Sequence, residues 1–254
     1  MANGLRSEKT ETIGVSLDEV NLAQMNLKGV VKNTPFDFSE NLSRQFEANI
    51  YLKREDLQVV RSYKLRGAYN KIVQLSEQEK NNGVICASAG NHAQGVAYSC
   101  QQLNIEGKIV MPTTTPQQKI KQVKWFGKER IEIILHGDTF DDASTYARQL
   151  SNEGNITFIH PFDDEKVIAG QGTVALEILN QSDKPIDYIF VPIGGGGLAS
   201  GTISVIKSLS PKTKIIGVEP SGASSMAEAI KQNKSVALAK IDPFVDGAAV
   251  TKVG

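Results

Sequence analysis

Residues 84–95 have the sequence VICASAGNHAQG, an apolar run followed by a turn of small residues and the start of a helical pattern. A strand that passes through a short loop into a helix is the unit from which parallel sheets are built. The same alternation recurs along the chain, with predicted strands at 84–88, 108–111, 131–135, 156–159, 188–192 and 214–218. Helices are predicted around 93–103 and 120–126, and at 167–179 and 198–209. These patterns predict the α/β class, with mostly parallel sheets flanked by helices.

The order of elements also predicts how the chain is divided. Neither an internal repeat nor a low-complexity linker interrupts it, and the pattern breaks near residues 161–164. We therefore expect two closely packed lobes that share a cleft, one formed by 1–80 together with 163–254 and the other by 81–162. Before the alternating region, 35–47 is predicted as loop and helix and 50–53 as a short strand.

Composition excludes several classes of protein. The chain has 254 residues and equal numbers of basic and acidic side chains, 28 each, so it lacks the net positive charge that nucleic-acid binders and anionic-membrane binders use. Cys86 and Cys100 lie in apolar segments, which predicts buried thiols rather than a disulfide or metal pair. The polar first dozen residues and the lack of a run of roughly 20 apolar residues predict a cytoplasmic protein that is neither secreted nor anchored.

Residues 61–69, RSYKLRGAY, place a lysine at the start of a predicted helix. Ser62 is positioned to cap that helix, which puts Lys64 in its first turn, where the helix dipole disfavours an ammonium group. Together with partial burial, this field favours the neutral amine, which is the nucleophilic form. The alternative is an ordinary surface lysine.

Two glycine-containing loops open predicted helices. In residues 88–95 the small side chains leave backbone N–H groups free to bind an anion, and Asn91 could reach a polar ring substituent or a carboxylate. His92 fits a local structural role better than that of a general base. Residues 194–197 are four consecutive glycines between a strand and a helix, which favours a phosphate cradle over a flexible linker.

A dinucleotide site is the rival interpretation of the second loop. Gly194, Gly196 and Ala199 fit the pattern G-x-G-x-x-A, and Glu219 follows 20 residues later at the end of the next strand. That interpretation assigns no function to Lys64 or to residues 88–95. A phosphorylated aldehyde cofactor on the lysine, with an amino-acid substrate, gives each of the three motifs a function.

These motifs, with IAGQGT at 168–173 and Glu219-Pro220, resemble the fold type II pyridoxal-phosphate enzymes, and within them the threonine dehydratases (threonine ammonia-lyases) of the isoleucine pathway. The resemblance covers about 16–254 and implies a fold like the tryptophan synthase β subunit. It implies that pyridoxal 5'-phosphate is carried on Lys64, with Asn91 bonded to the ring hydroxyl. The implied phosphate-binding residues are Gly194, Gly195, Gly196, Gly197 and Leu198, and those for the substrate carboxylate are Ser88, Ala89, Gly90, Asn91 and His92.

The resemblance also implies the reaction. Lys64 exchanges with the amino group of L-threonine and then removes the Cα proton; the β-hydroxyl leaves, and hydrolysis gives 2-oxobutanoate and ammonia, or pyruvate from L-serine. Serine racemases of this family have a second serine where this chain has Ala89, so elimination is expected over racemisation. Relatives with a divalent-cation site carry an acidic residue where this chain has Ser225, so we expect no metal.

Family members continue beyond the segment that resembles 246–254. The resemblance therefore implies a large lobe incomplete at its C-terminus, in a family whose full-length members assemble from identical chains. A non-catalytic remnant acting as a binding module is the remaining alternative to a dehydratase, and a nicotinamide dehydrogenase is the less favoured one.

Overall fold

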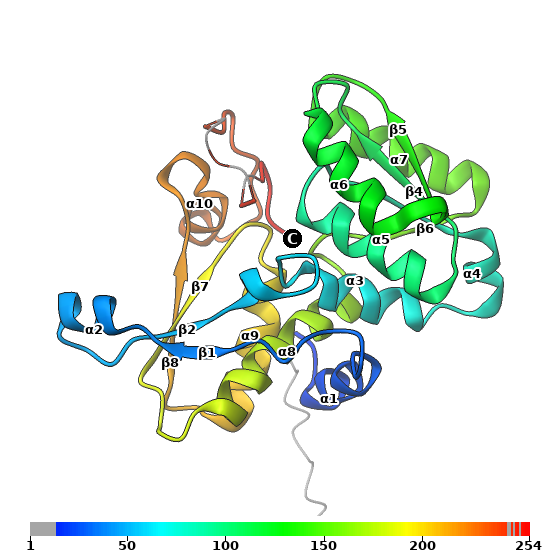
Figure 1. The fold of residues 1–254 in the computed structure, drawn as a ribbon. Helices are drawn as coiled ribbons and strands as arrows, with labels where there is room; N and C mark the ends of the chain where they lie inside the picture. Colours follow the sequence, from blue (N-terminus) through cyan, green and yellow to red (C-terminus); the bar gives the residue numbers. More distant parts are fainter. Residues whose placement is uncertain (1–13, 243–244, 246, 249) are drawn as a thin grey trace, which may run out of the picture.

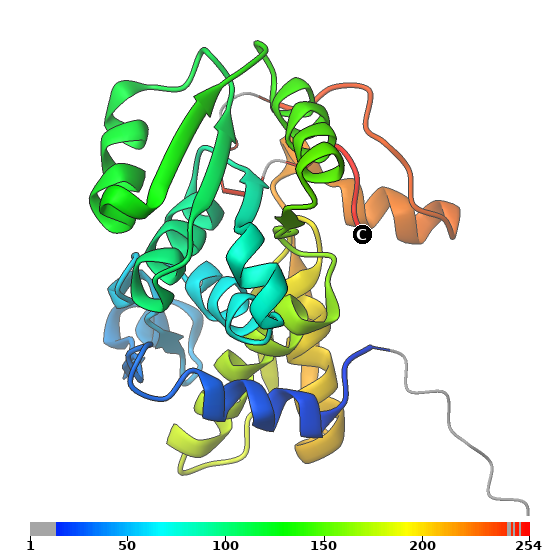
Figure 2. The ribbon, with the colours of Figure 1, turned by 90° about the vertical axis from the view of Figure 1, so that its right-hand side faces the viewer.

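We describe the protein from a computed structural model, which covers residues 14–242, 245, 247–248 and 250–254. Helices and strands alternate through most of the chain, as the α/β class requires (Figures 1 and 2). The helices are α1 (Leu17–Asn26), α2 (Glu40–Phe46), α3 (Lys64–Val73), α4 (Glu77–Asn82), α5 (Asn91–Leu103), α6 (Gln117–Gly127), α7 (Phe140–Gly154), α8 (Glu165–Gln181), α9 (Gly197–Leu209) and α10 (Ser225–Gln232), with 3-10 turns η1 (Glu55–Leu57), η2 (Lys128–Arg130) and η3 (Ser221–Ala223). The strands are β1 (Phe36–Phe38), β2 (Tyr51–Lys53), β3 (Val84–Ala87), β4 (Gly107–Met111), β5 (Ile131–Leu135), β6 (Thr157–Phe158), β7 (Tyr188–Pro192) and β8 (Lys214–Val218).

Four parallel strands form the larger sheet, in the order β5-β4-β3-β6. Successive side chains of a strand point to opposite faces. Val84 and Cys86 of β3 accordingly pack in the cluster that includes residues of α3, α5 and α6, whereas Ile85 and Ala87 pack with Ala143 and Ala147 of α7. Both faces are buried, which explains why β3 is apolar throughout.

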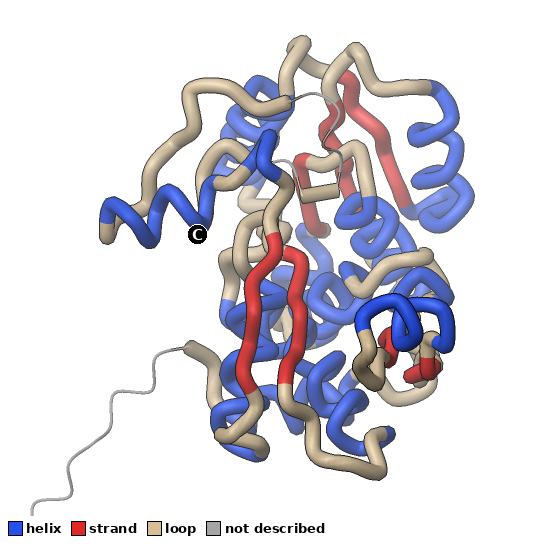
Figure 3. The backbone as a smooth tube through the Cα atoms, turned by 90° about the vertical axis from the view of Figure 1, so that its left-hand side faces the viewer, coloured by secondary structure: helices blue, strands red, loops and turns tan. Residues whose placement is uncertain are grey.

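A second parallel pair, β7 and β8, packs on α1, α8 and α9. Ile189 and Val191 of β7 are buried on that side, whereas Tyr188 and Phe190 are exposed on the other. In Figure 3 this outer face is turned toward the viewer, and within the described chain no helix covers it. The antiparallel pair β1 and β2, joined through α2, extends from the body beside this sheet (Figure 1).

Helix α3 connects the two sheets because it packs against both α5 and α8. Glycines allow the close crossings: a Cβ on Gly170 of α8 would lie 2.6 Å from the Arg66 carbonyl oxygen of α3, and one on Gly201 of α9 would lie 2.5 Å from the Ile168 carbonyl oxygen of α8. Helices α3, α8 and α9 therefore meet backbone to backbone. This contact fixes the start of α3 relative to the start of α9.

Most sequence-based predictions of the elements are confirmed. The strands 131–135, 188–192 and 214–218 have the predicted bounds, and Cys86 and Cys100 are buried free thiols. Ser62 Oγ accepts the Lys64 N–H at 3.1 Å. Helix α3 begins at Lys64, and the residue between them, Tyr63, already has helical backbone angles. The two-lobe division stays a prediction, although the four-stranded sheet lies entirely within 84–158.

Some elements differ from those predicted from the sequence. Strand β1 lies in the segment predicted as loop and helix and owes its conformation to pairing with β2. Helix α7 was not predicted, because its buried face consists of two alanines, Ala143 and Ala147, rather than a stripe of large apolar residues. None of the helices in the described chain is both long enough and apolar enough to span a membrane.

Candidate active site

The connection between β6 and α8, residues 159–164, contacts all three motifs singled out in the sequence. We call it the 159–164 junction. Ile159, Pro161 and Phe162 each meet one motif, although the motifs come from α3, α5 and the loop before α9. The junction therefore brings together residues that lie far apart in the sequence.

Lys64 reaches the junction from the first position of α3. Its Nζ donates a hydrogen bond to the Pro161 carbonyl oxygen at 2.8 Å. Burial lowers the pKa of Lys64 to about 8 because the charged ammonium is desolvated. A carbonyl oxygen accepts from a neutral amine as well as from an ammonium group, so this bond is compatible with the nucleophilic form. Lys64 is therefore not an ordinary surface lysine.

The 88–95 loop lies beside Lys64. A Cβ on Gly95 would be 3.1 Å from Leu65 N and 3.2 Å from the Lys64 carbonyl carbon, so α5 and the start of α3 are in close contact. At the other end of this motif, Gly90 caps α5 with no side-chain hydrogen bond, and the space where its Cβ would be is open. The first N–H groups of α5 have no acceptor within the helix, which suits a carboxylate.

His92 has the structural role that its surroundings in the sequence predicted. It is 3% exposed, and its Nε2 lies 2.9 Å from the Ile159 carbonyl oxygen. Desolvation, with a smaller effect of Lys64, lowers the pKa of His92 to about 3. The ring is therefore neutral and donates to the junction. The backbone N–H of His92 is free to serve a ligand at the start of α5.

The tetraglycine loop rests on Phe162. A Cβ on Gly195 would overlap the Phe162 ring, and one on Gly197 would lie 2.6 Å from the Phe162 carbonyl oxygen. Gly196 has φ +100°, a conformation that a branched side chain rarely adopts. Helix α9 starts at Gly197 with no side chain capping it. The unpaired N–H groups of its first turn and a loop without side chains fit a phosphate group.

The end of the chain covers the same loop. Gly254 N donates to the Gly195 carbonyl oxygen at 3.2 Å, and a Cβ on Gly194 would be 3.3 Å from Ala248 Cα. Asn91, exposed at the first position of α5, faces this segment at Gly247. The residues predicted to contact the cofactor ring and the phosphate therefore both lie near the segment that contains Gly247, Ala248 and Gly254.

Glu219 is engaged elsewhere, which argues against a dinucleotide site. Its two carboxylate oxygens accept the N–H groups of Met226 and Ala227, each at 2.7 Å, at the start of α10. A nicotinamide enzyme would need this carboxylate for a ribose. Among the described residues, no group of three or more His, Cys, Asp or Glu side chains is placed to hold a metal ion.

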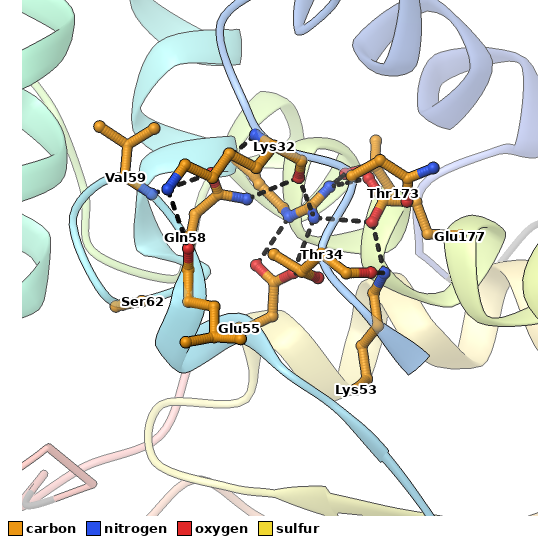
Figure 4. A network of polar contacts seen from close by, with 12 residues as sticks. Lys32, Thr34, Lys53, Glu55, Gln58, Val59, Ser62, Thr173 and Glu177 are labelled. Atoms are coloured by element: carbon orange, nitrogen blue, oxygen red, sulfur yellow. Dashed lines mark hydrogen bonds and ion pairs between the residues drawn. The ribbon is translucent and has the colours of Figure 1, made fainter. Parts of the chain in front are cut away.

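Sequence reasoning missed a buried ionic cluster behind Lys64. Arg66 follows Lys64 by two positions, about 200° around the helix, so the two side chains point in opposite directions. The Arg66 guanidinium is fully buried and bonds to Glu55 at 2.7 Å and to Glu177 at 2.6 Å (Figure 4). Lys53 adds a second cation, with its Nζ 2.6 Å from Glu177. The cluster therefore joins β2, η1, α3 and α8.

The four charges of this cluster balance. Burial disfavours the charge of Arg66, but its hydrogen bonds to Glu55 and Glu177 outweigh that effect and keep its pKa above the ordinary value. Burial lowers the pKa of Lys53, with Glu177 opposing the shift. The cluster is stable as two cations with two carboxylates and depends on each member. The available signal in the sequence was an arginine within a predicted helix whose other residues are mostly small or apolar.

Glu177→Gln is expected to lower the free energy of unfolding by about 3–5 kcal/mol, because it leaves two buried cations with one carboxylate. Urea denaturation at neutral pH measures the change. Glu40→Gln is the matched control, since Glu40 pairs with Arg44 on the surface and is 80% exposed. That control should lower the free energy of unfolding by less than about 1 kcal/mol. Equal losses in the two variants would show that the cluster is no more important than a surface pair.

The chain is similar to several known proteins. A family model described as "Pyridoxal-phosphate dependent enzyme" matches residues 27–254. The chain is 58% identical over 240 residues to the protein named L-threonine dehydratase biosynthetic IlvA of Halalkalibacterium halodurans, covering 94% of this chain and 58% of that protein. It therefore spans a little over half the length of that relative.

Solved structures resemble the fold. A processed threonine deaminase isoform 2 from Solanum lycopersicum matches with a TM-score of 0.88 and 47% identity, covering 95% of this chain and 67% of that one. Maize serine racemase matches with a TM-score of 0.89 and 32% identity, covering 95% and 72% of the two chains.

Proposed function

Because this chain belongs to the family of pyridoxal-phosphate dependent enzymes, we propose that it deaminates L-threonine to 2-oxobutanoate and ammonia with pyridoxal 5'-phosphate carried on Lys64. L-serine would give pyruvate. The observation that carries the proposal is Lys64 itself, a buried amine whose pKa is lowered to about 8 and whose Nζ lies on the junction beside the tetraglycine loop.

The residues around Lys64 suit such a cofactor and substrate. Gly194–Leu198 offer backbone N–H groups and no obstructing side chain to a phosphate, and Asn91 at the start of α5 would bond the ring hydroxyl. The loop before α5 together with the first residues of that helix, Ser88–His92, would bind the substrate carboxylate. When bound, the cofactor supplies an electron sink that stabilises negative charge at the substrate Cα.

The lowered pKa gives Lys64 its part in proton transfer. An amine with a pKa of about 8 is about one-tenth neutral at pH 7, whereas the neutral fraction of an ordinary lysine is below about 0.1%. The neutral Nζ can accept the substrate Cα proton. The carbonyl oxygen of Pro161 holds Nζ in place through a hydrogen bond. The partial burial of Lys64 limits the access of water to this amine.

Ala89 favours elimination over racemisation. Its methyl group packs against the core cluster that contains α5, so this position offers no hydroxyl for proton return. Racemisation needs a second acid on the other face of Cα. We therefore expect L-threonine and L-serine to lose their β-hydroxyl without formation of the D-amino acid.

The proposal extends to a place in metabolism. The relatives are named as biosynthetic enzymes, so we propose that the 2-oxobutanoate serves isoleucine biosynthesis in the cytoplasm. We also propose the lobes 1–80 with 163–254 and 81–162, and an assembly of identical chains. The zero net charge gives no reason to expect a nucleic-acid partner.

Three measurements on the purified protein test this function. Incubation with pyridoxal phosphate should give a yellow protein, and borohydride reduction followed by peptide mapping should place the adduct on Lys64. Addition of L-threonine should release 2-oxobutanoate and ammonia in equal amounts. An adduct on another lysine with Lys64 unmodified, or cofactor binding without ketoacid release from either amino acid, would contradict the proposal.

The reactivity of the Lys64 amine should follow pH through about 8, which is the value set by its burial. Acylation of the cofactor-free protein over pH 6–10, followed by mass spectrometry of the Lys64 peptide, measures it, and the Lys28 peptide in the same digest corrects for reagent loss. The lowered pKa also predicts that the free energy of unfolding rises with pH between about 8 and the pKa of this lysine in the unfolded chain. In that range the unfolded chain binds one more proton than the folded chain. A half-maximal acylation rate above pH 10 would show that Lys64 is not buried.

A further inference from the structure

His160 lies inside the 159–164 junction and has no role in the function proposed above. Its Nδ1 accepts two backbone N–H groups, from Phe162 at 3.3 Å and from Asp163 at 2.8 Å. A nitrogen that accepts carries no proton, so the neutral ring has its proton on Nε2. The ring also packs edge-on against Phe162, with 4.7 Å between centroids. One side chain thus closes the turn that follows it.

The two residues at the centre of this turn are the ones that reach the candidate active site. The carbonyl oxygen of Pro161 receives the Lys64 Nζ hydrogen bond, and Phe162 supports Gly195 and Gly197. Residues 161 and 162 are adjacent, so a rotation of the turn would move both contacts together. The conformation closed by His160 therefore sets where Lys64 lies relative to the tetraglycine loop.

We propose that the unprotonated Nδ1 of His160 is a positioning group. It holds Pro161 in hydrogen-bonding contact with the Lys64 amine and Phe162 in contact with the tetraglycine loop. The inference rests on the proposed function of that site and assigns a further residue to it. His160 does not contact the reacting atoms in this arrangement. It acts through the backbone of the junction.

Protonation would end this role, because a protonated Nδ1 donates and cannot accept the two N–H groups. Burial is the main reason that the pKa of His160 lies below its ordinary value; Arg148 of α7 and Lys64 of α3 lower it further, while Asp163 and Asp164 raise it. Among the described residues, His92 of α5 is a further titratable neighbour, kept neutral by its own burial. The acceptor is thus present at neutral pH and is lost in acid.

Two uncharged variants separate the acceptor from the rest of the ring. In His160→Asn the side-chain oxygen occupies the place of Nδ1 and can accept the same N–H groups, whereas His160→Gln moves the acceptor one bond further out. The chain has three histidines, and His136 is exposed and stacked on Tyr146 at the end of β5. His136→Asn is therefore the control for removing a titratable ring.

The first readout is Lys64 itself in the cofactor-free protein. A turn that no longer closes admits water to the amine, which raises the pKa of Lys64 toward its ordinary value. A rise of one in this pKa lowers the neutral fraction of the amine at pH 7 about tenfold. We expect Lys64 acylation at pH 7 to fall about tenfold in His160→Gln. It should stay within about twofold of the wild-type rate in His160→Asn and His136→Asn.

The second readout is the affinity for pyridoxal phosphate at pH 5.5 relative to pH 7.5, followed by the absorbance of the bound cofactor. Titration of the cofactor phosphate affects every variant equally. We expect the wild type and His136→Asn to lose affinity in acid more steeply than His160→Asn, whose acceptor does not titrate. This comparison stands even where His160→Gln fails to fold, which circular dichroism at pH 7.5 reports.

The outcomes are distinct. If His160→Asn is as impaired as His160→Gln, the ring matters for packing on Phe162 and the acceptor role is wrong. If both behave as wild type, His160 does not position the junction. If the wild type binds no pyridoxal phosphate while Lys64 acylation still falls only in His160→Gln, the proposed function fails but the positioning role holds.

Discussion

Lys64→Ala is expected to abolish covalent attachment of pyridoxal phosphate and to lower threonine deamination by at least about a thousandfold, since a positioned general base contributes about 10²–10⁴ in rate. The amine that the substitution removes is the buried group on the Pro161 carbonyl oxygen, and no other lysine is held by that residue within the described chain. Borohydride reduction with peptide mapping, together with a 2-oxobutanoate assay, measures both effects.

Lys80→Ala is the matched control for this change. Lys80 lies in α4, outside the 159–164 junction, and its Nζ pairs with the exposed Glu77 at 2.8 Å. Its loss should lower stability slightly and leave attachment at Lys64 intact. An adduct that persists in Lys64→Ala would overturn the assignment. Stability of Lys64→Ala should change little, because the lost hydrogen bond is offset by removing the cost of burying the amine.

Gly196→Val is expected to weaken pyridoxal phosphate binding by at least about a hundredfold. Valine cannot easily adopt φ +100°, so the loop must change shape and withdraw its N–H groups from the phosphate. Losing two charge-assisted hydrogen bonds, each contributing about 1.5–3 kcal/mol, accounts for that factor or more. Met226 Cε, 2.9 Å from the position of a Cβ, is the flexible end of a side chain and can move. Equilibrium titration with the cofactor measures the affinity.

The control must carry the same backbone strain away from the site. Gly29 has φ +79° and is exposed, with no atom within 4 Å of the position of its Cβ. Gly29→Val should therefore lose some stability and keep the wild-type affinity for the cofactor. Similar losses of affinity in the two valine variants would mean that the tetraglycine loop is not the phosphate site.

Much of this protein was predictable because its signals are local. Strands such as Ile131–Leu135 and Tyr188–Pro192 follow from β-branched runs bounded by turn residues, and helix α9 follows from apolar spacing after four glycines. Lys64, Asn91 and Gly194–Gly197 could be named as candidates because each stands at the start of a helix, where the chemistry of the backbone is known from the sequence.

The arrangement of these candidates was not predictable from such signals. Lys64 meets Pro161 across 97 positions of the sequence, and Arg66 meets Glu177 across 111. Hydrogen bonds between distant segments leave no periodicity in either segment, so the junction had shown only as a break in the pattern near 161–164. For the same reason Glu219, a candidate ribose ligand in the sequence, turned out to cap α10.

Local backbone preferences and apolar spacing act over one helical turn or one strand. These signals identified the α/β class and the candidate residues for binding and catalysis. Burial and long-range hydrogen bonding act only once the segments are packed. They alone lower the pKa of the Lys64 amine, direct the His92 ring to the junction and the His160 ring to the backbone of its own turn, and balance the charge of Arg66 behind the site.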